Sequence, residues 1–422
     1  MTAHGTHARG TSMTVLAWRN LWRNRRRTLL TLSSIAVGVF LAILFTAMQD
    51  RNWADMIDLA ARLGSGHVTL EDPAYLDAPS LSRTVRHTEE LRRMALADRD
   101  VTRATERIAG QLMLNTARES RGAGFIAYDP AAEDSTTFAF PQAVTEGEPL
   151  AGATGGGIMV GARLAANLGV TLGDKVVYTM TDRTGEIVSG LARVSAIVRT
   201  GSPAADAALC LLPIDAVRGL LGYAPDEATQ VAVFVRDQRD SDAVARRLGA
   251  EVGPEVAAVP WHETQTGLAA FIGLKVGGAR FMEILIAVLV AAGIFNTLFV
   301  SVMERMREFG ILMAIGWSPG RLFGLVMLES AWLGILGLVG AALVTALPYW
   351  YLARTGIDLS GLLAGNAMDV AGIAMPSTFR VGIYGNHLAF IGVAAFVATL
   401  LSGLYPAWRA GRVDPIETIR LV

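Results

Sequence analysis

The sequence predicts an α-helical membrane protein with four transmembrane helices and a large α+β periplasmic domain inserted between the first and the second helix. Of the 422 residues, 52% are hydrophobic and 18% are charged, whereas about a quarter of the residues in a soluble domain are charged. Four stretches reach the roughly 20 apolar residues that a membrane-spanning helix needs. Most of the charged residues lie between the first two stretches.

The four stretches set the predicted transmembrane helices. We place these helices at residues 28–49, 281–303, 322–348 and 388–408. A cleaved signal peptide is the alternative for the first stretch, because basic residues precede it. Its apolar core is longer than about 15 residues and no small-residue cleavage site follows it, so we favour a membrane span.

Arginines next to the spans predict the orientation of the chain. In short flanking segments, basic residues favour the cytoplasmic side. The arginines gather before the first span, between the second and the third, and after the fourth. These three places share one side of a four-helix topology, so both termini are expected in the cytoplasm. The residues concerned are Arg19, Arg23, Arg25, Arg26, Arg27, Arg305, Arg307, Arg321, Arg409, Arg412 and Arg420.

The segments outside the spans differ in character. Residues 14–27 repeat Trp-Arg-Asn and place Trp18 and Trp22 one turn apart, which is typical of an amphipathic helix at the membrane interface. The other predicted segments are a disordered tail at 1–13, a short charged cytoplasmic helix at 304–321, a periplasmic loop at 349–387 and a cytoplasmic C-terminal segment at 409–422.

The long outward segment, residues 50–280, is predicted to be an α+β domain. Short β-like runs bounded by Gly, Pro and Asp occur at 67–71, 175–180, 192–198, 209–213 and 230–235, and helical patterns at 88–98, 160–168 and 240–249. The glycine-rich run 152–157 lacks the G-x-G-x-x-G spacing of a phosphate-binding loop. We interpret it as a flexible connection between subdomains.

Several chemistries are disfavoured by the residue types present. Cys210 is the single cysteine, so no cysteine-based metal site is expected. Lys175 and Lys275 are the only lysines and each precedes Val, whereas a P-loop needs Lys followed by Ser or Thr. The net charge is −1, which gives no overall attraction to nucleic acid. We predict that the chain is not an enzyme, binds no cofactor or metal, and has no nucleic-acid partner.

Polar and small residues inside the predicted spans are candidates for function. Ser34, Gly38, Ala42 and Thr46 form a stripe of small side chains along the first helix. Such a stripe lets helices approach closely, either within the chain or in contact with a second transmembrane subunit. Glu329 is the one ionisable residue expected well inside a span. Because no basic residue lies within the hydrophobic stretches, we expect a protonated carboxyl that is hydrogen-bonded to a neighbouring helix.

Three segments resemble the FtsX-like or MacB-like permeases of ABC transporters. Residues 296–330 resemble the coupling-helix region, with Asn296, an ER-x-RE-x-GIL-x-A-x-G pattern and the Leu-Glu pair at 328–329. Residues 403–420 resemble the closing motif of the family, and residues 17–30 its entry helix. In the outward domain, residues 161–176 and 196–214 resemble the periplasmic core of lipoprotein-releasing permeases of the LolC/LolE type.

The resemblance implies a permease of the bacterial inner membrane that works by mechanotransmission. A separate ATPase dimer, which binds ATP and Mg²⁺, would move the coupling helix and thereby the periplasmic domains. The small-residue stripe would line a contact or a gate for a lipidated or amphiphilic substrate. Residues implied in ATPase contact are Glu304, Arg305, Arg307, Glu308, Gly310 and Gly316.

Lipoprotein release from the inner membrane is the function that the resemblance favours. The implied partners are the ATPase dimer, a second permease copy or a paralogue, membrane lipid, and a periplasmic carrier or outer-membrane partner. Two alternatives stay open: a MacB-like efflux permease, and an FtsX-like transmembrane scaffold that activates a cell-wall hydrolase. The size of the outward domain favours transport over the scaffold.

Overall fold

The structure of the chain is a computed structural model that describes residues 13–358, 369–370, 373–374 and 378–412. The predicted tail, apart from Met13, lies outside these residues, as do most of the C-terminal segment and part of the loop predicted at 349–387. The chain divides into two compact units. A helical unit contains the described residues up to Asn52, those from Lys275 to Ile357 and those from Phe379 onward; a sheet unit contains Trp53–Leu274 and Asp358–Thr378.

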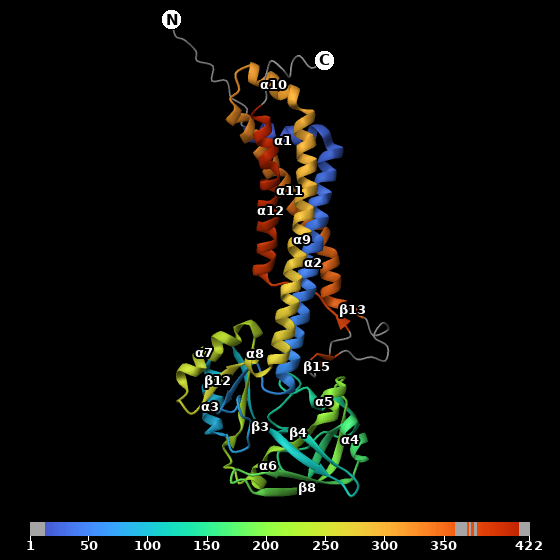
Figure 1. The fold of residues 1–422 in the computed structure, drawn as a ribbon, viewed down its shortest axis with the longest axis vertical. Coiled ribbons are helices and arrows are strands. Elements are labelled where there is room, and N and C mark those ends of the chain that lie inside the picture. Colours follow the sequence, from blue (N-terminus) through green and yellow to red (C-terminus); the bar gives the residue numbers. More distant parts are fainter. Residues whose placement is uncertain (1–12, 359–368, 371–372, 375–377, 413–422) are drawn as a thin grey trace. The chain divides into compact units, whose positions relative to one another are not determined.

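Four long helices carry the apolar stretches (Figure 1). They are α2 (Arg25–Leu63), α9 (Thr266–Glu304), α11 (Pro319–Thr355) and α12 (Gly385–Ala410). Each is long and apolar enough to cross a membrane, so the expected number of apolar helices is confirmed for the described residues. A core of Ile35, Val39, Ile294 and Leu333 joins α2, α9 and α11 in the helical unit.

The first two of these helices are longer than the predicted spans. The apolar run ends before Asp50, but α2 continues to Leu63, and α9 begins at Thr266 rather than near residue 281. In these extensions Met56 and Ala60 of α2 pack against Leu268 of α9. A hydropathy pattern detects the end of an apolar surface, whereas these helices continue as an amphipathic pair, which is why the outward segment predicted at 50–280 includes helix at both ends.

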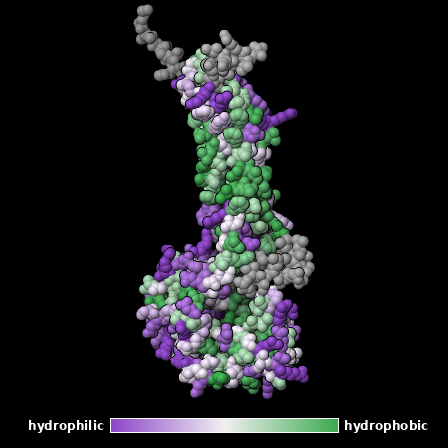
Figure 2. Space-filling model, in the orientation of Figure 1, coloured by the Kyte–Doolittle hydropathy of each residue, from purple (hydrophilic) through white to green (hydrophobic). Residues whose placement is uncertain are grey.

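Apolar side chains cover much of the outer surface of the helical unit. Only 11% of the most apolar 18-residue segment of α9 is buried within the chain. Its residues Ile284, Val288 and Leu289 are each more than 60% exposed. Figure 2 shows hydrophobic side chains in green over the helices and hydrophilic side chains over much of the sheet unit. Such an exposed surface is typical of helices that lie in lipid or meet another subunit.

A closed ring of six strands forms one part of the sheet unit. The ring runs β3, β4, β9, β6, β8, β7 and back to β3. Its strands are β3 (Val101–Asn115), β4 (Ser120–Tyr128), β6 (Gly157–Gly161), β7 (Lys175–Thr181), β8 (Ile187–Val198) and β9 (Leu209–Pro213). Alternate side chains such as Leu112, Phe125 and Val176 fill its interior together with Leu164 of α4 and Val217 of α6.

A second sheet shares the long strand β3. Residues Val101–Arg107 of β3 pair with β11 (Gln230–Val235), whereas Ile108–Asn115 pair with β4. The sheet continues through β1 (Val68–Glu71) to β12 (Ala257–Pro260). Helices α3 (Thr88–Ala97) and α7 (Ser241–Glu251) pack on one of its faces. Ala61 near the end of α2 packs against Ala232 and Phe234 on β11.

Shorter elements complete the described residues of both units. They are β2 (Val85–Arg86), η2 (Phe140–Ala143), β5 (Val144–Gly147), α4 (Ala162–Leu168), α5 (Pro203–Ala208), α6 (Ile214–Leu221), β10 (Glu227–Ala228), η3 (Gln238–Asp240), α8 (Trp261–Thr264), β13 (Ile357–Asp358), β14 (Asp369–Val370), β15 (Ile373–Ala374) and β16 (Thr378–Phe379). All five predicted strands and all three predicted helices of the outward segment are present, within a few residues of their expected bounds.

Several elements of the sheet unit escaped the sequence patterns, and β3 and β4 are the longest of them. Strands β3 and β4 were not singled out, although β3 has 15 residues. The two halves of β3 serve different sheets, so its buried and exposed positions do not alternate regularly. A buried arginine, Arg107, lies at the junction; its Nε is 2.8 Å from Oε1 of Glu133, and it also donates to the carbonyl oxygen of Gly64 at the end of α2.

Candidate coupling site

The candidate site is built from three short helices next to the long ones. They are α1 (Met13–Leu21), the 3-10 turn η1 (Trp22–Asn24) and α10 (Met306–Ala314). The ring centroids of Trp18 and Trp22 are 5.8 Å apart, and Trp18 meets Trp332 of α11 edge to face at 5.1 Å. The predicted helical face of tryptophans is therefore present, and it contacts α11.

Helix α10 lies between two positions where the helical conformation of the backbone is interrupted. Helix α9 ends at Glu304 and α10 begins at Met306, with Arg305 between them at φ −102° and ψ 8°. At the other end the chain turns through Gly316, whose φ of +102° favours glycine, and enters α11 at Pro319. Gly310 lies on the buried side of α10. Within residues 304–321, predicted as a coupling helix, the structure has one short helix between two turns.

Glu329 of α11 accepts two donors at this site. Nη1 of Arg305 lies 2.9 Å from its Oε2 and 3.0 Å from its Oε1, and Nδ2 of Asn20 donates to Oε1 at 2.8 Å. The side chains of Arg305 and Glu329 are 15% and 11% exposed. The hydrogen bond to a neighbouring helix that the sequence predicts for Glu329 is present, from Asn20 of α1. Arg305, which lies outside the apolar stretches, also reaches this carboxyl, and the sequence pattern did not indicate that contact.

Two further ion pairs surround the break at Arg305. Nη1 of Arg23 donates to Oε2 of Glu308 at 3.0 Å, and Arg27 pairs with Glu304. The hydrogen bond from Arg23 lowers the pKa of Glu308 below its usual value, although burial opposes this effect. Glu304, Arg305 and Glu308, three of the residues implied in ATPase contact, therefore have partners within the chain.

The exposed side of α10 also carries residues that form no ion pair with the other described residues. Arg307, Ile311, Ala314 and Ile315 are exposed, and Ile311 and Ile315 reach 45% and 74% exposure. Their spacing of three to four residues places them on one side of the helix. We call these four residues the α10 surface. An apolar stripe with a cation at one end can dock against a protein surface.

The small-residue stripe of α2 is divided between two environments. A Cβ atom built on Gly38 would lie 2.6 Å from Cγ2 of Val290 in α9, and Oγ1 of Thr46 donates to Oε1 of Glu283, also in α9, at 2.9 Å. Ser34 is exposed and Ala42 is partly exposed. At Gly38 and Thr46 the stripe therefore packs against α9 within the chain, while Ser34 remains on the outer surface.

Glu283 is a second ionisable residue within an apolar helix, and the sequence analysis did not single it out. It lies at the beginning of the predicted second span, where a charged residue is expected to mark the boundary of the apolar stretch. Asn296, the other intramembrane polar residue predicted, is exposed on α9. Its amide is thus available on the outer surface of the helical unit.

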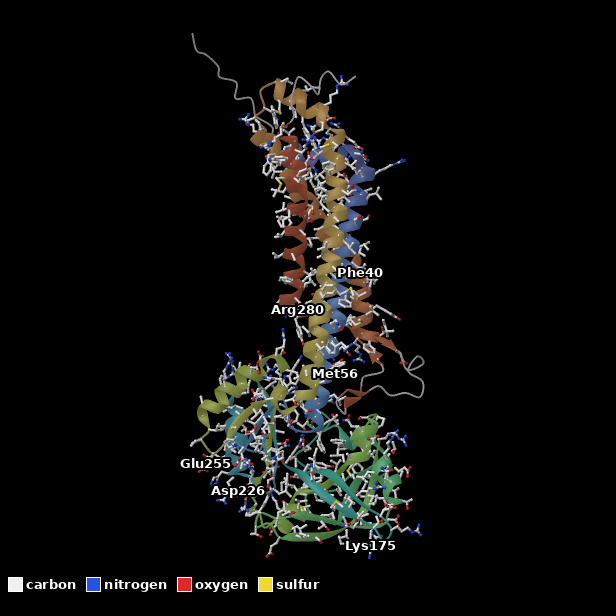
Figure 3. The ribbon with its side chains drawn as sticks, in the orientation of Figure 1. Phe40, Met56, Lys175, Asp226, Glu255 and Arg280 are labelled. Carbon is white, nitrogen blue, oxygen red and sulfur yellow. The ribbon has the colours of Figure 1, made fainter. Side chains whose placement is uncertain are left out.

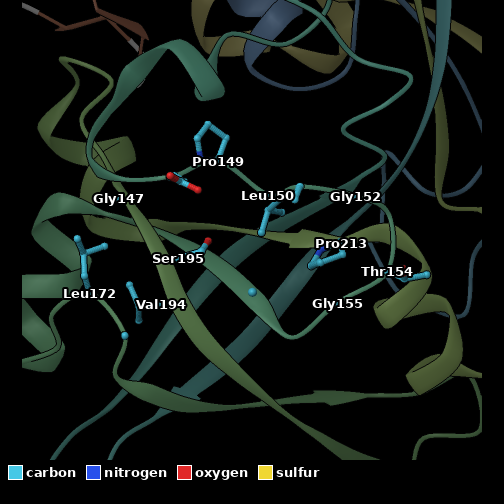
Figure 4. Close-up of a pocket in the computed structure, with 14 residues that line it drawn as sticks. Gly147, Pro149, Leu150, Gly152, Thr154, Gly155, Leu172, Val194, Ser195 and Pro213 are labelled. Atoms are coloured by element: carbon cyan, nitrogen blue, oxygen red, sulfur yellow. The ribbon is translucent and has the colours of Figure 1, made fainter.

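Two cavities in the described residues are large enough to hold a small ligand. One, of about 280 Å³, is lined by the ion pairs around Arg305. The other, of about 490 Å³, lies in the sheet unit beside the glycine-rich run 152–157 (Figure 4). Its lining is mostly Gly, Pro, Leu and backbone, with Glu148 as the one ionisable lining residue. Among the described residues, no group of three or more His, Cys, Asp or Glu side chains could hold a metal ion.

Sequence reasoning missed the N-terminal partners of the site. Asn20, Arg23 and Arg27 were interpreted as the polar side of an interfacial helix, and Arg23 lies 285 positions before Glu308. The repeated Trp-Arg-Asn was the available signal. It places arginines and asparagines at helical spacing but does not indicate which carboxylates they meet.

Comparison with known families supports the sequence resemblance. The MacB-like periplasmic core domain matches residues 28–251, and the FtsX-like permease C-terminal domain matches residues 280–415. A "Lipoprotein-releasing system transmembrane protein LolC" from Xylella fastidiosa (strain 9a5c) is 24% identical over 277 residues, which are 62% of this chain and 64% of that protein. The alignment thus covers slightly less than two thirds of the relative.

Two further similarities concern shorter parts of the chain. A "Macrolide export ATP-binding/permease protein MacB" from Syntrophobacter fumaroxidans is 33% identical over 159 residues, which are 36% of this chain and 16% of that protein. The solved extracellular domain of the ABC-type transporter YknZ from Gram-positive bacteria aligns with 46% of this chain and 98% of its own, at 12% identity and a TM-score of 0.32. That score supports no further conclusion.

Proposed function

The chain belongs to the FtsX-like and MacB-like family of ABC transporter permeases, and from this premise we propose that it is the membrane subunit of a lipoprotein-releasing complex. In this proposal a separate ATPase hydrolyses ATP with Mg²⁺ in the cytoplasm. The permease transmits the resulting movement to its periplasmic domain, which releases a lipidated or amphiphilic substrate from the inner membrane.

The α10 surface is the observation that carries the proposal. Glu304, Arg305 and Glu308 are held by partners within the chain, so the α10 surface, which forms no ion pair with the other described residues, is left for a partner protein. It offers Arg307 beside the apolar side chains of Ile311 and Ile315. Interfaces often combine an apolar centre with arginine at the edge. We propose this surface, rather than the full set of charged residues, as the ATPase contact.

The proposed orientation follows from the arginines beside the apolar helices. Arg307 and Arg321 flank α10, and five arginines lie at or just before the start of α2. Basic flanks favour the cytoplasm, which puts the α10 surface on the side where ATP is available. The segment that bears the sheet unit then lies between the first and second spans on the periplasmic side.

The substrate class is supported by the similarity to the LolC protein of Xylella fastidiosa. The similarity to MacB supports an efflux permease that exports a macrolide as a second candidate, over a smaller share of the chain. A second permease copy or a paralogue is proposed to meet the apolar surface of α9, since so little of it is buried within the chain.

Charge reversal at Arg307 tests the proposed contact. Arg307→Glu removes the cation of the α10 surface without breaking an ion pair in the described residues, so we expect the ATPase to be lost from the purified complex while the permease stays folded. Arg26→Glu is the matched control, because Arg26 is also exposed beside an apolar helix. Retention of a full complement of ATPase by the Arg307→Glu permease would refute the contact.

A further inference from the structure

The break between α9 and α10 lies at Arg305. In the proposed function, a movement that the ATPase imposes on α10 has to pass through this break to reach α9. Helix α9 ends at Glu304 and α10 begins after Arg305, whose backbone leaves the helical conformation. A helix that is interrupted in this way can bend at the break. Any push on the α10 surface would then be absorbed as bending unless something holds the two helices at a fixed angle.

One short segment of the N-terminal region contacts both sides of this break. Arg27 pairs with Glu304 and also donates to the hydroxyl of Ser301, which places it on the α9 side. Arg23, one turn earlier, donates through Nη1 to Oε2 of Glu308 at 3.0 Å, which is on the α10 side. Arg27 and Arg23 thus connect the end of α9 to α10 across the break. We call these two arginines the splint.

The residue at the break is itself anchored to a third helix. Nη1 of Arg305 is 2.9 Å from Oε2 of Glu329 in α11, and its Nε is 3.4 Å from Oε2 of Glu308. Asn20 of α1 donates to the same Glu329 carboxylate at 2.8 Å. Because Arg305 and Glu329 are largely buried, water competes weakly for their charges, and their geometry is well defined.

We infer that Arg23 and Arg27 form a splint that makes α9 and α10 move as one body, with these two arginines as positioning residues and Arg305 as the anchor on α11. This inference rests on the proposed function, because it assumes that a partner pushes on α10. It assigns to the N-terminal segment a role in transmission rather than only in membrane attachment. Loss of the splint leaves the α10 surface intact and lets the break flex.

The exposed pair Arg23 and Glu308 gives the sharpest test. Their side chains are 62% and 39% exposed, so charge reversal should leave folding intact, unlike reversal at the buried Arg305. Three variants are compared with the wild type: Arg23→Glu, Glu308→Arg, and the double variant that exchanges the two charges. Arg26→Glu is the control, since Arg26 lies in the same segment and is exposed.

Two quantities are measured on complexes in native membranes whose acylated proteins carry radioactive palmitate. The first is the amount of ATPase that co-purifies with the permease, and the second is the labelled protein released per ATP hydrolysed. We expect each single variant to retain its ATPase and to release less label per ATP by about tenfold, while the double variant returns to within about twofold of the wild type. The Arg26→Glu control should match the wild type.

Three results would overturn the splint. Single variants with normal release per ATP would show that the pair transmits nothing. A double variant as poor as the single ones would show that the ion pair is not the cause. Loss of ATPase from Arg23→Glu would make Arg23 a docking residue instead. A wild type that binds no ATPase or releases no label would refute the proposed function itself, so the two failures are distinguishable.

Discussion

The buried carboxyl of Glu71 predicts a pH-dependent stability of the sheet unit. Glu71 ends strand β1, is 2% exposed, and its Oε1 atom has no hydrogen-bond partner among the described residues. Burial, and then the negative charge of Asp72, raise the pKa of Glu71 from 4.5 to about 7. The folded protein therefore holds this proton more tightly than the unfolded chain does.

The sign and size of the effect follow from linkage between protonation and folding. The contribution of the protonated carboxyl is fully present below pH 4.5 and is lost as the pH rises through about 7. A shift of one pKa unit corresponds to about 1.36 kcal/mol, so the shift of Glu71 costs at most about 3 kcal/mol of unfolding free energy at high pH. At pH 5 the cost is less than about 1 kcal/mol.

Glu71→Gln removes the titration and keeps the shape of the side chain. We expect the free energy of unfolding of the variant to gain about 2–3 kcal/mol on that of the wild type between pH 5 and pH 8.5. In a domain of this size that is roughly 5–10 °C in melting temperature. The assay is thermal unfolding of the full chain in detergent, followed by tryptophan fluorescence at pH 5, 7 and 8.5.

An exposed glutamate serves as the control for general effects of charge. Glu255, labelled in Figure 3, is exposed, and we expect Glu255→Gln to follow the wild type at every pH. If Glu71→Gln and the wild type lost stability in parallel from pH 5 to pH 8.5, Glu71 would not be the group responsible, and its proposed titration in the folded state would be refuted.

Other predictions concern packing and buried charge. Gly38→Leu should destabilise the helical unit by about 1–3 kcal/mol, because its side chain would overlap Val290. Ser34→Leu on the same stripe is exposed and should leave the melting temperature unchanged; if it prevents pairing with a second permease, the outer part of the stripe is an intermolecular contact. Arg107→Met should cost about 3–5 kcal/mol, because it leaves the carboxylate of Glu133 buried without its partner. Replacing Glu133 by Gln as well should recover part of that loss, and no recovery in thermal unfolding would contradict the charge argument.

Features that depend on neighbouring residues in the sequence could be predicted well. The runs at 209–213 and 230–235 are short, apolar and bounded by turn residues, and both are buried strands in the structure. The apolar helices were equally clear, because the hydrocarbon thickness fixes their length. The extensions of α2 and α9 were not, since a charged residue such as Asp50 ends an apolar surface without ending a helix.

The candidate site could be predicted only in part. The sequence indicated α10 and its charged residues, but not which of them have partners within the chain. That choice depends on partners far away in the sequence: Glu308 meets Arg23, and Arg305 meets Glu329. The hydropathy pattern also indicated no basic partner for Glu329. Arg305, which reaches it from the end of another helix, lies outside every apolar stretch. Long side chains at helix ends commonly reach such positions.

Affinity purification of the chain from native membranes in mild detergent tests the central claim most directly. Mass spectrometry would identify the bound proteins and lipids. We expect a P-loop ATPase in stoichiometric amount together with acylated protein, as a lipoprotein-releasing permease requires. A complex without an ATPase would contradict the claim, and an ATPase with a cell-wall hydrolase but no acylated protein would replace transport by the scaffold function.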